Sequence, residues 1–315
     1  MDLKQLKALV TVAEVGSVTR AAELLHLVQP AVTRQIRAME TELGVALFER
    51  TRNGMQLTEA GAIMAERSRR ALRELARATA EIHPQRGEVS GQVTVGLLES
   101  TLDTLAEPLV TAVKASHPHI ELRMQTGYSG HLQRWLDDGD LDVTLLYNLT
   151  DTPSVNVVPL LSEQLWAVAP PEAGLRADRP IPLAEVAEQS LVMPAPGHAL
   201  RALIDTAAAR TGVLFDVSVQ TNSLALQKQF VLGGHGWTIL PGAGIVADVT
   251  AGVLSAAPLC EPEIRRLVVL GMPRTGRLPA AAEVVAQELV RQVRTAVQAG
   301  RWPSARWQEH GGGAR

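Results

Sequence analysis

A heptad repeat in the N-terminal third constrains this chain more than any other feature. From Gly61 onward, small and apolar residues alternate at spacings of four and three, which is typical of a coiled-coil seam over three heptads. A helix over 58–83 with Thr58 as its N-cap is about 40 Å long. Its own chain cannot bury such a stripe, so we expect 58–86 to be a linker helix that pairs with a second copy. The seam comprises Ala65, Ser68, Leu72, Leu75, Thr79 and Ile82.

Residues 1–57 are predicted to form a compact helical domain in which one helix has two different faces. This helix opens at Gln29-Pro30 and carries an apolar stripe that starts at Val32 with spacings of i+4, i+7 and i+11. The opposite face has amide, hydroxyl and guanidinium groups and no carboxylate. Together with the preceding short helix and turn, this pattern favours a helix-turn-helix. The face comprises Gln29, Pro30, Thr33, Arg34 and Arg37.

These side chains have the chemistry that reads a DNA groove. Gln29 can pair with adenine, Arg34 or Arg37 can bind guanine or a phosphate, and a threonine can touch a thymine methyl. Residues 44–57 favour a hairpin, because Asn-Gly prefers a tight primed turn. Arg50 and Arg52 flank that turn, as in the wing of a winged helix. The alternative interpretation is that the basic helix face is simply solvated.

The chain changes character after residue 91. Short apolar runs alternate with helical segments over 92–299, which predicts an α/β fold with parallel βαβ units in open sheets. We expect two lobes, lobe I over about 92–160 and 266–299 and lobe II over about 161–265. A hinge is expected over 87–91, where Gly87 and Gly91 interrupt the pattern. Residues 300–315 have no periodicity and are expected to be a flexible tail.

Composition excludes several classes of protein. Cys260 is the only cysteine, so neither an intramolecular disulfide nor a cysteine-rich metal site can form, and we expect no metal and no cofactor. Aromatic residues make up 3% of the chain, which argues against a stacking surface for single-stranded nucleic acid. The sequence has no apolar run of about 18 residues, so we expect a cytoplasmic protein without a membrane partner.

The order of these parts resembles the LysR-type transcriptional regulators. The resemblance is carried by residues 17–61, SVTRAAELLHLVQPAVTRQIRAMETELGVALFERTRNGMQLTEAG, and continues to about residue 299. VTVGLLEST is similar to the first strand and ligand loop of the family's effector domain, and GGHGWTILPGAG to its glycine-rich segment. The stretch at 127–148 resembles the branch of nitrogen-assimilation and aromatic-acid regulators.

The resemblance implies a regulator rather than an enzyme. It implies a winged helix-turn-helix that binds a pseudo-palindromic double-stranded operator, and a linker helix that pairs two chains. It further implies a tetramer built as a dimer of dimers, and contact with RNA polymerase. The C-terminal half is expected to resemble a periplasmic binding protein, with a small effector between two Rossmann-like lobes.

Polar residues at the ends of the predicted strands are candidates for the effector site, because ligands of open α/β folds bind there. The candidates are Ser100, Thr101, Tyr128, Ser129, Tyr147, Asn148, His198, Asn222 and Ser223. Each serine or asparagine at a helix start can equally be an N-cap. An organic acid is expected to bind hydroxyls, backbone N–H groups and His198. Beside them, Glu99 either points away or meets an amine of the ligand.

Enzymatic interpretations of the chain are weaker. The sequence GYSGH lacks the second glycine of the nucleophile elbow, because His131 stands in its place, so we predict no catalytic residues. The runner-up hypothesis is a small-molecule binder or enzyme with an accessory N-terminal domain. It differs from a regulator in lacking salt-dependent DNA binding.

Overall fold

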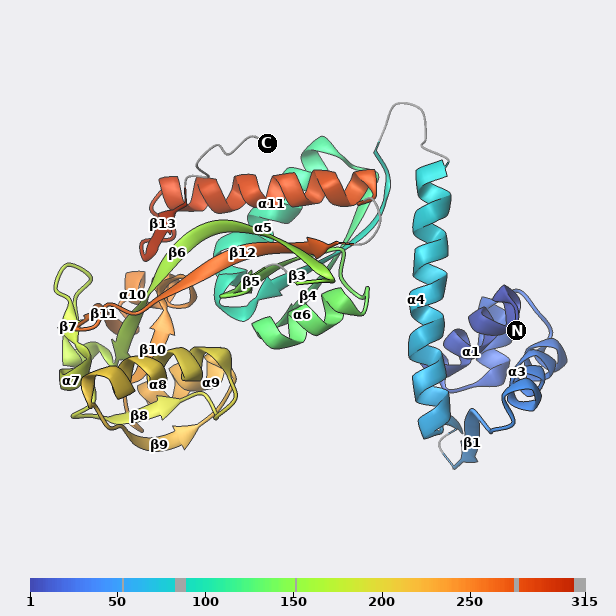
Figure 1. The fold of residues 1–315 in the computed structure, drawn as a ribbon, viewed down its shortest axis with the longest axis horizontal. Coiled ribbons are helices and arrows are strands. Elements are labelled where there is room, and N and C mark those ends of the chain that lie inside the picture. The colour runs from blue at the N-terminus through green and yellow to red at the C-terminus, as the bar shows by residue number, and fades with distance from the viewer. Residues whose placement is uncertain (53, 83–88, 151, 275–277, 309–315) are drawn as a thin grey trace. The chain divides into compact units, whose positions relative to one another are not determined.

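A computed structural model describes residues 1–315 except 53, 83–88, 151, 275–277 and 309–315. The chain divides into two compact units, Met1–Pro84 and Gln85–Arg315. Figure 1 shows a small helical unit and a larger α/β unit, and each is described by itself below.

The N-terminal unit is built from four helices and a hairpin. The elements are α1 (Leu3–Val15), α2 (Val18–Leu24), α3 (Gln29–Leu43), β1 (Phe48–Thr51), β2 (Gly54–Leu57) and α4 (Glu59–Ile82). Leu9, Val32 and Met39 are completely buried in its core. The hairpin packs on the turn after α1, where the Met55 amide donates to the Gly16 carbonyl at 2.9 Å. Gly54 has a φ of 112°, and a Cβ there would lie 2.5 Å from that same carbonyl oxygen, so only glycine fits.

Helix α4 contradicts part of the expectation for its seam. Ala65 and Ser68 are buried, because α1 of the same unit packs along the start of α4. Leu72 is half-buried, whereas Leu75 is 48% exposed and Thr79 is exposed. The side chain of Ile82 lies outside the described residues. The chain itself therefore covers the first part of the seam and leaves Leu75 and Thr79 for a partner.

The C-terminal unit is an α/β structure built on one long curled sheet and a second sheet of two parallel strands. Its strands are β3 (Gly91–Leu98), β4 (Ile120–Gly127), β5 (Val143–Tyr147), β6 (Val155–Ala169), β7 (Ile181–Pro182), β8 (Ser190–Met193), β9 (Asp216–Gln220), β10 (Thr238–Pro241), β11 (Ser255–Cys260), β12 (Arg265–Pro273) and β13 (Ala305–Trp307). Its α-helices are α5 (Leu102–Ser116), α6 (Ser129–Asp137), α7 (Leu183–Val186), α8 (Ala199–Thr211), α9 (Leu224–Leu232), α10 (Val246–Thr250) and α11 (Ala280–Gln298). Short 3-10 turns are η1 (Glu99–Thr101), η2 (Pro171–Ala173) and η3 (Gly242–Gly244).

The sheet is mixed rather than wholly parallel. Strand order is β4-β3-β5-β12-β6-β11-β7, and β10 and β13 also pair with β6. β3 runs parallel to β4 and β5, as the alternation of strand and helix predicts. β12 runs antiparallel to both β5 and β6, because these long strands carry the chain between the lobes. The predicted parallel βαβ units are therefore confirmed at β3–β5 and at β8–β9, which form a separate two-stranded sheet, and antiparallel strands accompany them.

Two hydrophobic cores divide this unit into lobes. The first core gathers β3, β5 and the start of β6 with α5, α6 and α11. In Figure 1, α5 and α11 lie on one side of these strands and α6 on the other. The second lobe has apolar clusters on both faces of its sheet, around Leu165 and around Trp166, two successive residues of β6. One strand, β6, therefore contributes to both lobes.

The expectation of a flexible tail from residue 300 was wrong for the part that the structure describes. Trp302 is 1% exposed, and β13 pairs with β6. The Trp302 indole N–H donates to the Glu163 carboxylate at 2.8 Å, so a buried charge holds this segment in place. Sequence periodicity could not reveal it, because a three-residue strand is too short to repeat a two-residue period. Residues 309–315 lie outside the described part of the chain.

Candidate functional site

The predicted DNA-reading side chains lie on one exposed surface of the N-terminal unit. Gln29, Arg34 and Arg37 project from α3 and are exposed, as is Pro30, while Thr33 is half-buried. The Gln29 side-chain amide donates to the Thr33 hydroxyl at 3.1 Å, which holds both side chains at the start of the helix. The arrangement leaves polar groups directed outward from the first two turns.

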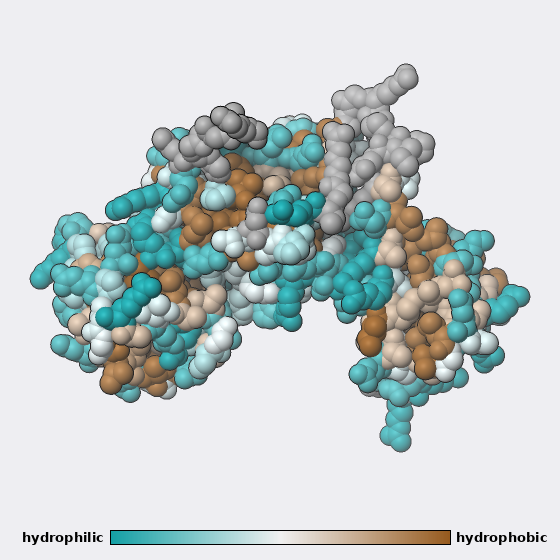
Figure 2. Space-filling view, in the orientation of Figure 1, coloured by the Kyte–Doolittle hydropathy of each residue, from teal (hydrophilic) through white to brown (hydrophobic). Residues whose placement is uncertain are grey.

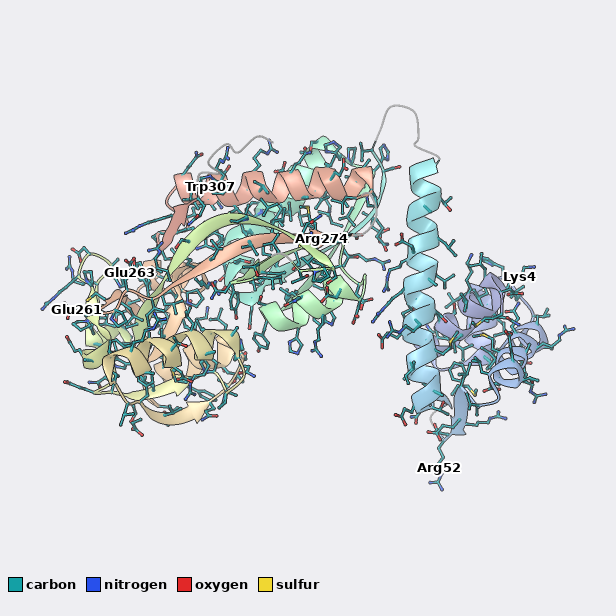
Figure 3. All side chains as sticks on the ribbon, viewed as in Figure 1. Lys4, Arg52, Glu261, Glu263, Arg274 and Trp307 are labelled. Atoms are coloured by element: carbon teal, nitrogen blue, oxygen red, sulfur yellow. The ribbon has the colours of Figure 1, made fainter. Side chains whose placement is uncertain are left out.

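The wing extends this surface with two further arginines. Arg50 and Arg52 are exposed, and Figure 3 shows Arg52 projecting from the end of the hairpin. Glu40 on α3 accepts from the amides of Leu47 and Phe48 at 2.8 and 3.3 Å, which fixes the hairpin to that helix. Within the described residues, no carboxylate pairs with an arginine of the predicted surface, so their charge is available to an external anion.

Sequence reasoning missed two apolar residues at this surface. Leu27 and Val28 are 42% and 68% exposed, immediately before the recognition helix. Val28 is the N-cap of α3 and offers no side chain to the first amides of the helix. Most of the large exposed apolar side chains belong to this smaller unit, and Figure 2 shows brown atoms on the visible face of both units. An uncapped, apolar helix start is a departure from the usual Ser, Thr, Asp or Asn.

A cleft of about 380 Å³ lies between the two lobes of the C-terminal unit. Its floor comes from β3, β10 and β12, and its walls come from the starts of α8 and α9 and from the loops after β4 and β5. Most of its lining is apolar, and its charged side chains are Glu99 and Arg266. The lining residues are Leu98, Glu99, Ser100, Gly127, Tyr128, Tyr147, His198, Leu200, Asn222, Leu224, Gln227, Leu240, Pro241 and Arg266.

Five of the nine predicted effector residues line this cleft: Ser100, Tyr128, Tyr147, His198 and Asn222. The other four are engaged in holding the frame. Thr101 donates to the Leu98 carbonyl, Ser129 accepts from the Tyr147 amide, Asn148 accepts from the Leu267 amide, and Ser223 caps α9 through the Leu226 amide. Of these four, Ser223 is an N-cap, as the alternative interpretation proposed, and the other three bind backbone groups outside a helix cap.

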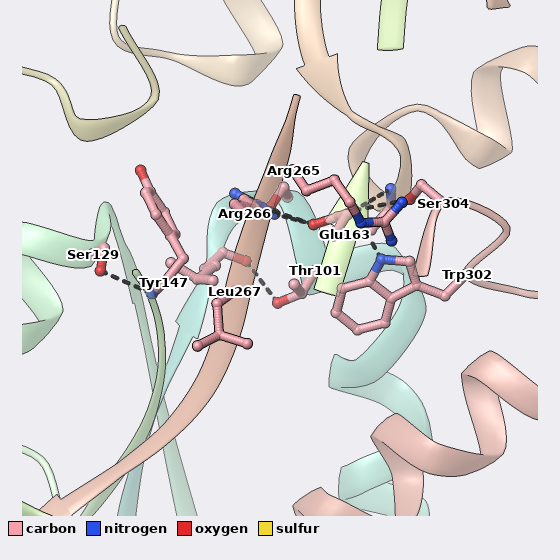
Figure 4. Close-up of polar contacts among 12 residues, drawn as sticks. Thr101, Ser129, Tyr147, Glu163, Arg265, Arg266, Leu267, Trp302 and Ser304 are labelled. Carbon is pink, nitrogen blue, oxygen red and sulfur yellow. Dashed lines mark hydrogen bonds and ion pairs between the residues drawn. The ribbon is translucent and has the colours of Figure 1, made fainter. Parts of the chain in front are cut away.

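A buried ionic network supports the cleft from below. Arg266 is 3% exposed, and its Nε and Nη2 both lie within 2.7 Å of one oxygen of Glu163, which is completely buried. The second Glu163 oxygen accepts from Trp302, Ser304 and the Ala243 amide. Figure 4 shows Arg266 beside Glu163, and Arg266 Nη2 also donates to Ser100 at 2.8 Å. This saturation of Glu163 holds the guanidinium rigidly at the cleft.

One edge of that guanidinium remains available. Nη1 of Arg266 has no hydrogen-bond partner among the described residues, although the residue lines the cleft. The guanidinium carbon lies 4.8 Å from the centre of the Tyr147 ring, a cation–π contact. Burial raises the pKa of Tyr147, and the nearby Arg266 opposes that shift. Tyr147 is therefore a neutral hydroxyl at physiological pH.

His198 presents a second unused donor. Its Nδ1 accepts from the Leu200 amide at 3.2 Å, which assigns the proton of the neutral ring to Nε2. That Nε2 is buried with no hydrogen-bond partner among the described residues. Burial lowers the pKa of His198, and positive charge on Arg266 and on His131 lowers it further. The ring packs edge-on against Tyr128, with centroids 4.9 Å apart, and so joins the two lobes.

The remaining polar groups of the cleft come from opposite lobes. Asn222 accepts from the Ala195 amide at 2.9 Å, which leaves its NH2 group available as a donor. Glu99 is half-buried and lines the cleft, and its Oε2 accepts from the Leu224 amide at the start of α9, at 3.3 Å. Burial and the Glu99 charge raise the pKa of Tyr128. Arg266, His198, Asn222 and Glu99 thus each present a polar atom without a partner among the described residues to a largely apolar cleft.

Sequence reasoning overlooked Arg266 and expected a carboxylate ligand to depend on hydroxyls and His198. The sequence does contain a pattern that identifies Arg266 as a buried residue. In RRLVVLG, the period-two alternation places Arg266 on the same face as Val268 and Leu270, a buried face, and LLSEQLW places Glu163 within another apolar run. A buried charge is costly unless an opposite charge pairs with it, so two opposite charges in buried strands are expected to form an ion pair. The local sequence pattern does not reveal that these two strands are neighbours. The antiparallel pairing of β6 with β12 brings Arg266 and Glu163 together, although they are 103 residues apart in the chain.

The described residues contain no group of histidine, cysteine or acidic side chains able to hold a metal ion. In the same part of the chain, no helix is long and apolar enough to cross a membrane. Cys260 is a free thiol, and burial together with the charges of Glu261 and Glu185 raises its pKa.

Two protein families match this chain. Residues 3–62 match the family described as bacterial regulatory helix-turn-helix protein, lysR family. Residues 86–294 match the LysR substrate binding domain. The two matches coincide with the two units and together account for most of the chain.

Curated relatives are similar along nearly their whole length. BbuR, an HTH-type transcriptional regulator of Bordetella bronchiseptica, is 27% identical over 303 residues, covering 96% of this chain and 93% of the relative. The DNA-binding transcriptional dual regulator OxyR of Escherichia coli is 29% identical over 290 residues, covering 90% and 95%. The nitrogen assimilation regulatory protein nac of Escherichia coli is 27% identical over 293 residues, covering 92% and 94%.

Solved structures share the fold at lower identity. A full-length OxyR variant from Pseudomonas aeruginosa has a TM-score of 0.72 at 21% identity, covering 98% of this chain and 99% of that one. Full-length CbnR in complex with its target DNA has a TM-score of 0.70 at 21% identity, covering 94% and 100%.

Proposed function

The chain belongs to the LysR family of DNA-binding transcriptional regulators with an effector-binding domain, and we propose that its effector is a small organic acid bound in the interlobe cleft. The observation that carries this proposal is Arg266. Arg266 lines the cleft, and its Nη1 has no hydrogen-bond partner among the described residues, while Glu163 holds the rest of the guanidinium in place. A fixed guanidinium edge is well suited to a carboxylate.

Two further donors support a carboxylate over a neutral ligand. Among the described residues, the buried His198 Nε2–H has no hydrogen-bond partner and the Asn222 NH2 group is unused. A buried donor without a partner costs about 1–3 kcal/mol, and a ligand oxygen removes that cost. The apolar lining would then bury the carbon skeleton of the acid.

The DNA contacts of this regulator are proposed to come from α3 and the wing. Gln29, Thr33, Arg34 and Arg37, with Pro30 at the helix start, would enter the major groove, and Arg50 and Arg52 would bind the flanking backbone. Pairing of two chains through α4 would set two recognition helices about 34 Å apart on a pseudo-palindrome. The exposed Leu75 and Thr79 support such pairing.

Higher assembly and action at the promoter are part of the same proposal. We propose that two dimers form a tetramer, and that the bound regulator contacts RNA polymerase. Effector binding would alter the balance between two arrangements of the assembly, by as much as its affinity for them differs. No catalytic role is proposed for any residue of the cleft.

Thiol-based sensing is not favoured for this chain, although some relatives are named hydrogen peroxide-inducible genes activators. The chain has one cysteine, so it cannot form a disulfide within itself. The raised pKa of Cys260 leaves the thiol protonated, which is the unreactive form. An effector bound without covalent chemistry fits these facts better.

The proposal is tested by footprinting the full-length protein on its own upstream DNA over a salt series, with and without small acids. A protected pseudo-palindrome whose affinity falls steeply with salt is expected. The acids are then compared with their uncharged amides in a thermal shift assay, because a ligand stabilises the state it binds. Stabilisation by carboxylates and not by amides is expected.

The matched variants are Arg266→Lys and Arg176→Lys. The first keeps a cation beside Glu163 but removes the Nη1 edge, whereas Arg176 pairs with Asp178 on an exposed loop. Loss of the carboxylate shift in the first variant alone is expected. Equal shifts from acids and amides in the wild-type protein would contradict a carboxylate effector.

A further inference from the structure

Glu99 places a carboxylate in the lining of the cleft, which also holds the unpartnered donors of His198 and Asn222. We propose that the effector carries an ammonium group beside its carboxylate, that Glu99 binds this ammonium, and that the effector class is therefore an α-amino acid. This inference rests on the proposed carboxylate recognition by Arg266 and deepens it. It assigns to Glu99 the role of selecting among acids of similar size.

The contacts of Glu99 leave half of its carboxylate unused. Oε2 accepts from the Leu224 amide across the cleft at 3.3 Å, and Oε1 has no partner among the described residues. No lysine, arginine or histidine forms an ion pair with it within those residues. Because Glu99 lines the cleft, an incoming ligand meets this acceptor directly.

The charges around the cleft do not balance without a cation from the ligand. Arg266 is neutralised by Glu163, which lies behind it and is completely buried. Glu99 therefore remains as one uncompensated negative charge in the lining, offset only by the amide at the start of α9. A simple carboxylate would bring a second negative charge into this half-enclosed space, where repulsion is stronger than in water. An ammonium group on the ligand removes that penalty.

The two recognition points belong to neighbouring residues of the cleft lining. Ser100, which follows Glu99 in the chain, accepts from Arg266 Nη2 at 2.8 Å. The Arg266 side and the Glu99 side of the cleft are therefore adjacent. An α-amino acid carries its carboxylate and its ammonium on one carbon atom, so it could present one group to each side.

The polar groups of the cleft that lack a partner then fall into two sets, donors for the ligand's carboxylate and an acceptor for its ammonium. Arg266 Nη1, His198 Nε2 and the Asn222 NH2 group are donors for the carboxylate, and Glu99 Oε1 is the acceptor for the ammonium. The ligand's side chain would face the leucines of the lining, Leu98, Leu200, Leu224 and Leu240. This lining favours an amino acid with an apolar side chain.

The test compares ligands that differ only in the ammonium group. The full-length protein is titrated calorimetrically with the apolar L-amino acids and with the matching L-2-hydroxy acids, such as phenylalanine against 3-phenyllactate and leucine against 2-hydroxyisocaproate. At least one amino acid is expected to bind at least about tenfold more tightly than its hydroxy acid, a difference of about 1.4 kcal/mol. This comparison in the wild-type protein needs no substitution.

The variant Glu99→Gln separates recognition from helix capping. Glutamine keeps an oxygen that can accept from the Leu224 amide but loses the charge. We expect it to remove the preference for the amino acid and to strengthen binding of the hydroxy acid. The control Glu172→Gln, at an exposed position on η2, is expected to change neither affinity. An unchanged preference in Glu99→Gln would reduce Glu99 to a cap of α9 and overturn the inference.

The remaining outcomes distinguish this inference from the proposed function. Equal affinities for amino and hydroxy acids, both lost in Arg266→Lys, would overturn the role of Glu99 and leave carboxylate sensing intact. Binding of hydroxy acids alone would do the same. No binding by either series would overturn the amino-acid assignment, and no stabilisation by any carboxylate in the thermal shift assay would overturn the proposed function as well.

Discussion

The proposed DNA-reading surface and the proposed effector cleft use the same residue type, arginine, in opposite ways. On α3 and the wing, Arg34, Arg37, Arg50 and Arg52 are exposed and pair with no carboxylate among the described residues. In the cleft, Arg266 is 3% exposed and is bonded to Glu163 and Ser100. The surface arginines are available to the charge of a partner, whereas the cleft arginine already has one.

The exposure of an arginine decides whether its charge contributes mainly to binding or to the stability of the fold. An exposed cation is solvated, so it contributes little to folding and gains its energy when phosphates release their counterions. A buried cation has lost its water, so the fold depends on its pair. Loss of a surface arginine should therefore affect DNA binding and leave stability unchanged, whereas loss of the charge of Arg266 should affect stability first.

The largest expected effect is on folding, from Arg266→Met. The change leaves Glu163 buried without a compensating charge, which costs about 3–5 kcal/mol. All five tryptophans belong to the C-terminal unit, so denaturant unfolding followed by tryptophan fluorescence reports on that unit. The control Arg176→Met, an exposed arginine also paired with a carboxylate, is expected to leave the midpoint unchanged. Equal unfolding midpoints for the two variants would contradict the proposed difference between buried and exposed arginines.

The next effect is on binding, from Arg34→Ala. Loss of a groove contact is expected to weaken operator binding by about 1–3 kcal/mol and to relax the preference at one base position. The free energy of unfolding should stay within about 0.5 kcal/mol of the wild type, as for other surface changes. Binding to a randomised operator library measures both affinity and preference. Arg210→Ala, exposed in the other unit, is the control, and an equal loss of affinity there would mean that net charge alone drives binding.

The same contrast explains how much could be predicted from the sequence. Face and exposure on α3 follow from a local period, because Val32, Ile36 and Met39 recur at helical spacing and are all buried as expected. The strands at VTVGLL, DVTLLY and RRLVVLG were likewise predicted from local runs. Local propensity and hydrophobic pattern therefore suffice for elements and for surfaces formed by one helix.

The cleft could be predicted only in part, because its residues meet through tertiary contacts. Arg266 and Glu163 are 103 residues apart, and Glu99 and Leu224 are 125 apart. Ser129 and Asn148 stand at strand ends, as the fold class requires, yet their side chains hold backbone amides instead of facing the cavity. The position of a residue at a strand end reduces the number of candidate effector-binding residues. The direction of each side chain depends on tertiary partners, which the local sequence pattern does not reveal.

A smaller effect is expected at the uncapped start of the recognition helix. Val28→Ser supplies an oxygen to the first amides of α3 and is expected to stabilise the N-terminal unit by about 0.5–2 kcal/mol. Hydrogen exchange of the α3 amides in the full-length protein measures this. Val45→Ser, an exposed valine outside a cap, is the control. If both variants slow exchange alike, general polarity and not capping is the cause.

The smallest effect is a pH dependence of the C-terminal unit that comes from His198. Burial holds its folded pKa below the usual 6.5, so the unfolded state takes up a proton first as the pH falls. Stability is therefore unaffected above about pH 6.5 and decreases as the pH falls below that value toward the lowered folded pKa. His198→Asn keeps an N-cap for α8 without a titrating ring, and tryptophan-monitored unfolding from pH 7.5 to about pH 5 should show a shallower loss than in the wild type. His119→Asn, at an exposed position, should follow the wild-type curve. If His198→Asn followed it too, the ring would be protonated as readily in the folded as in the unfolded protein, and His198 could not be the neutral donor that the cleft presents to its effector.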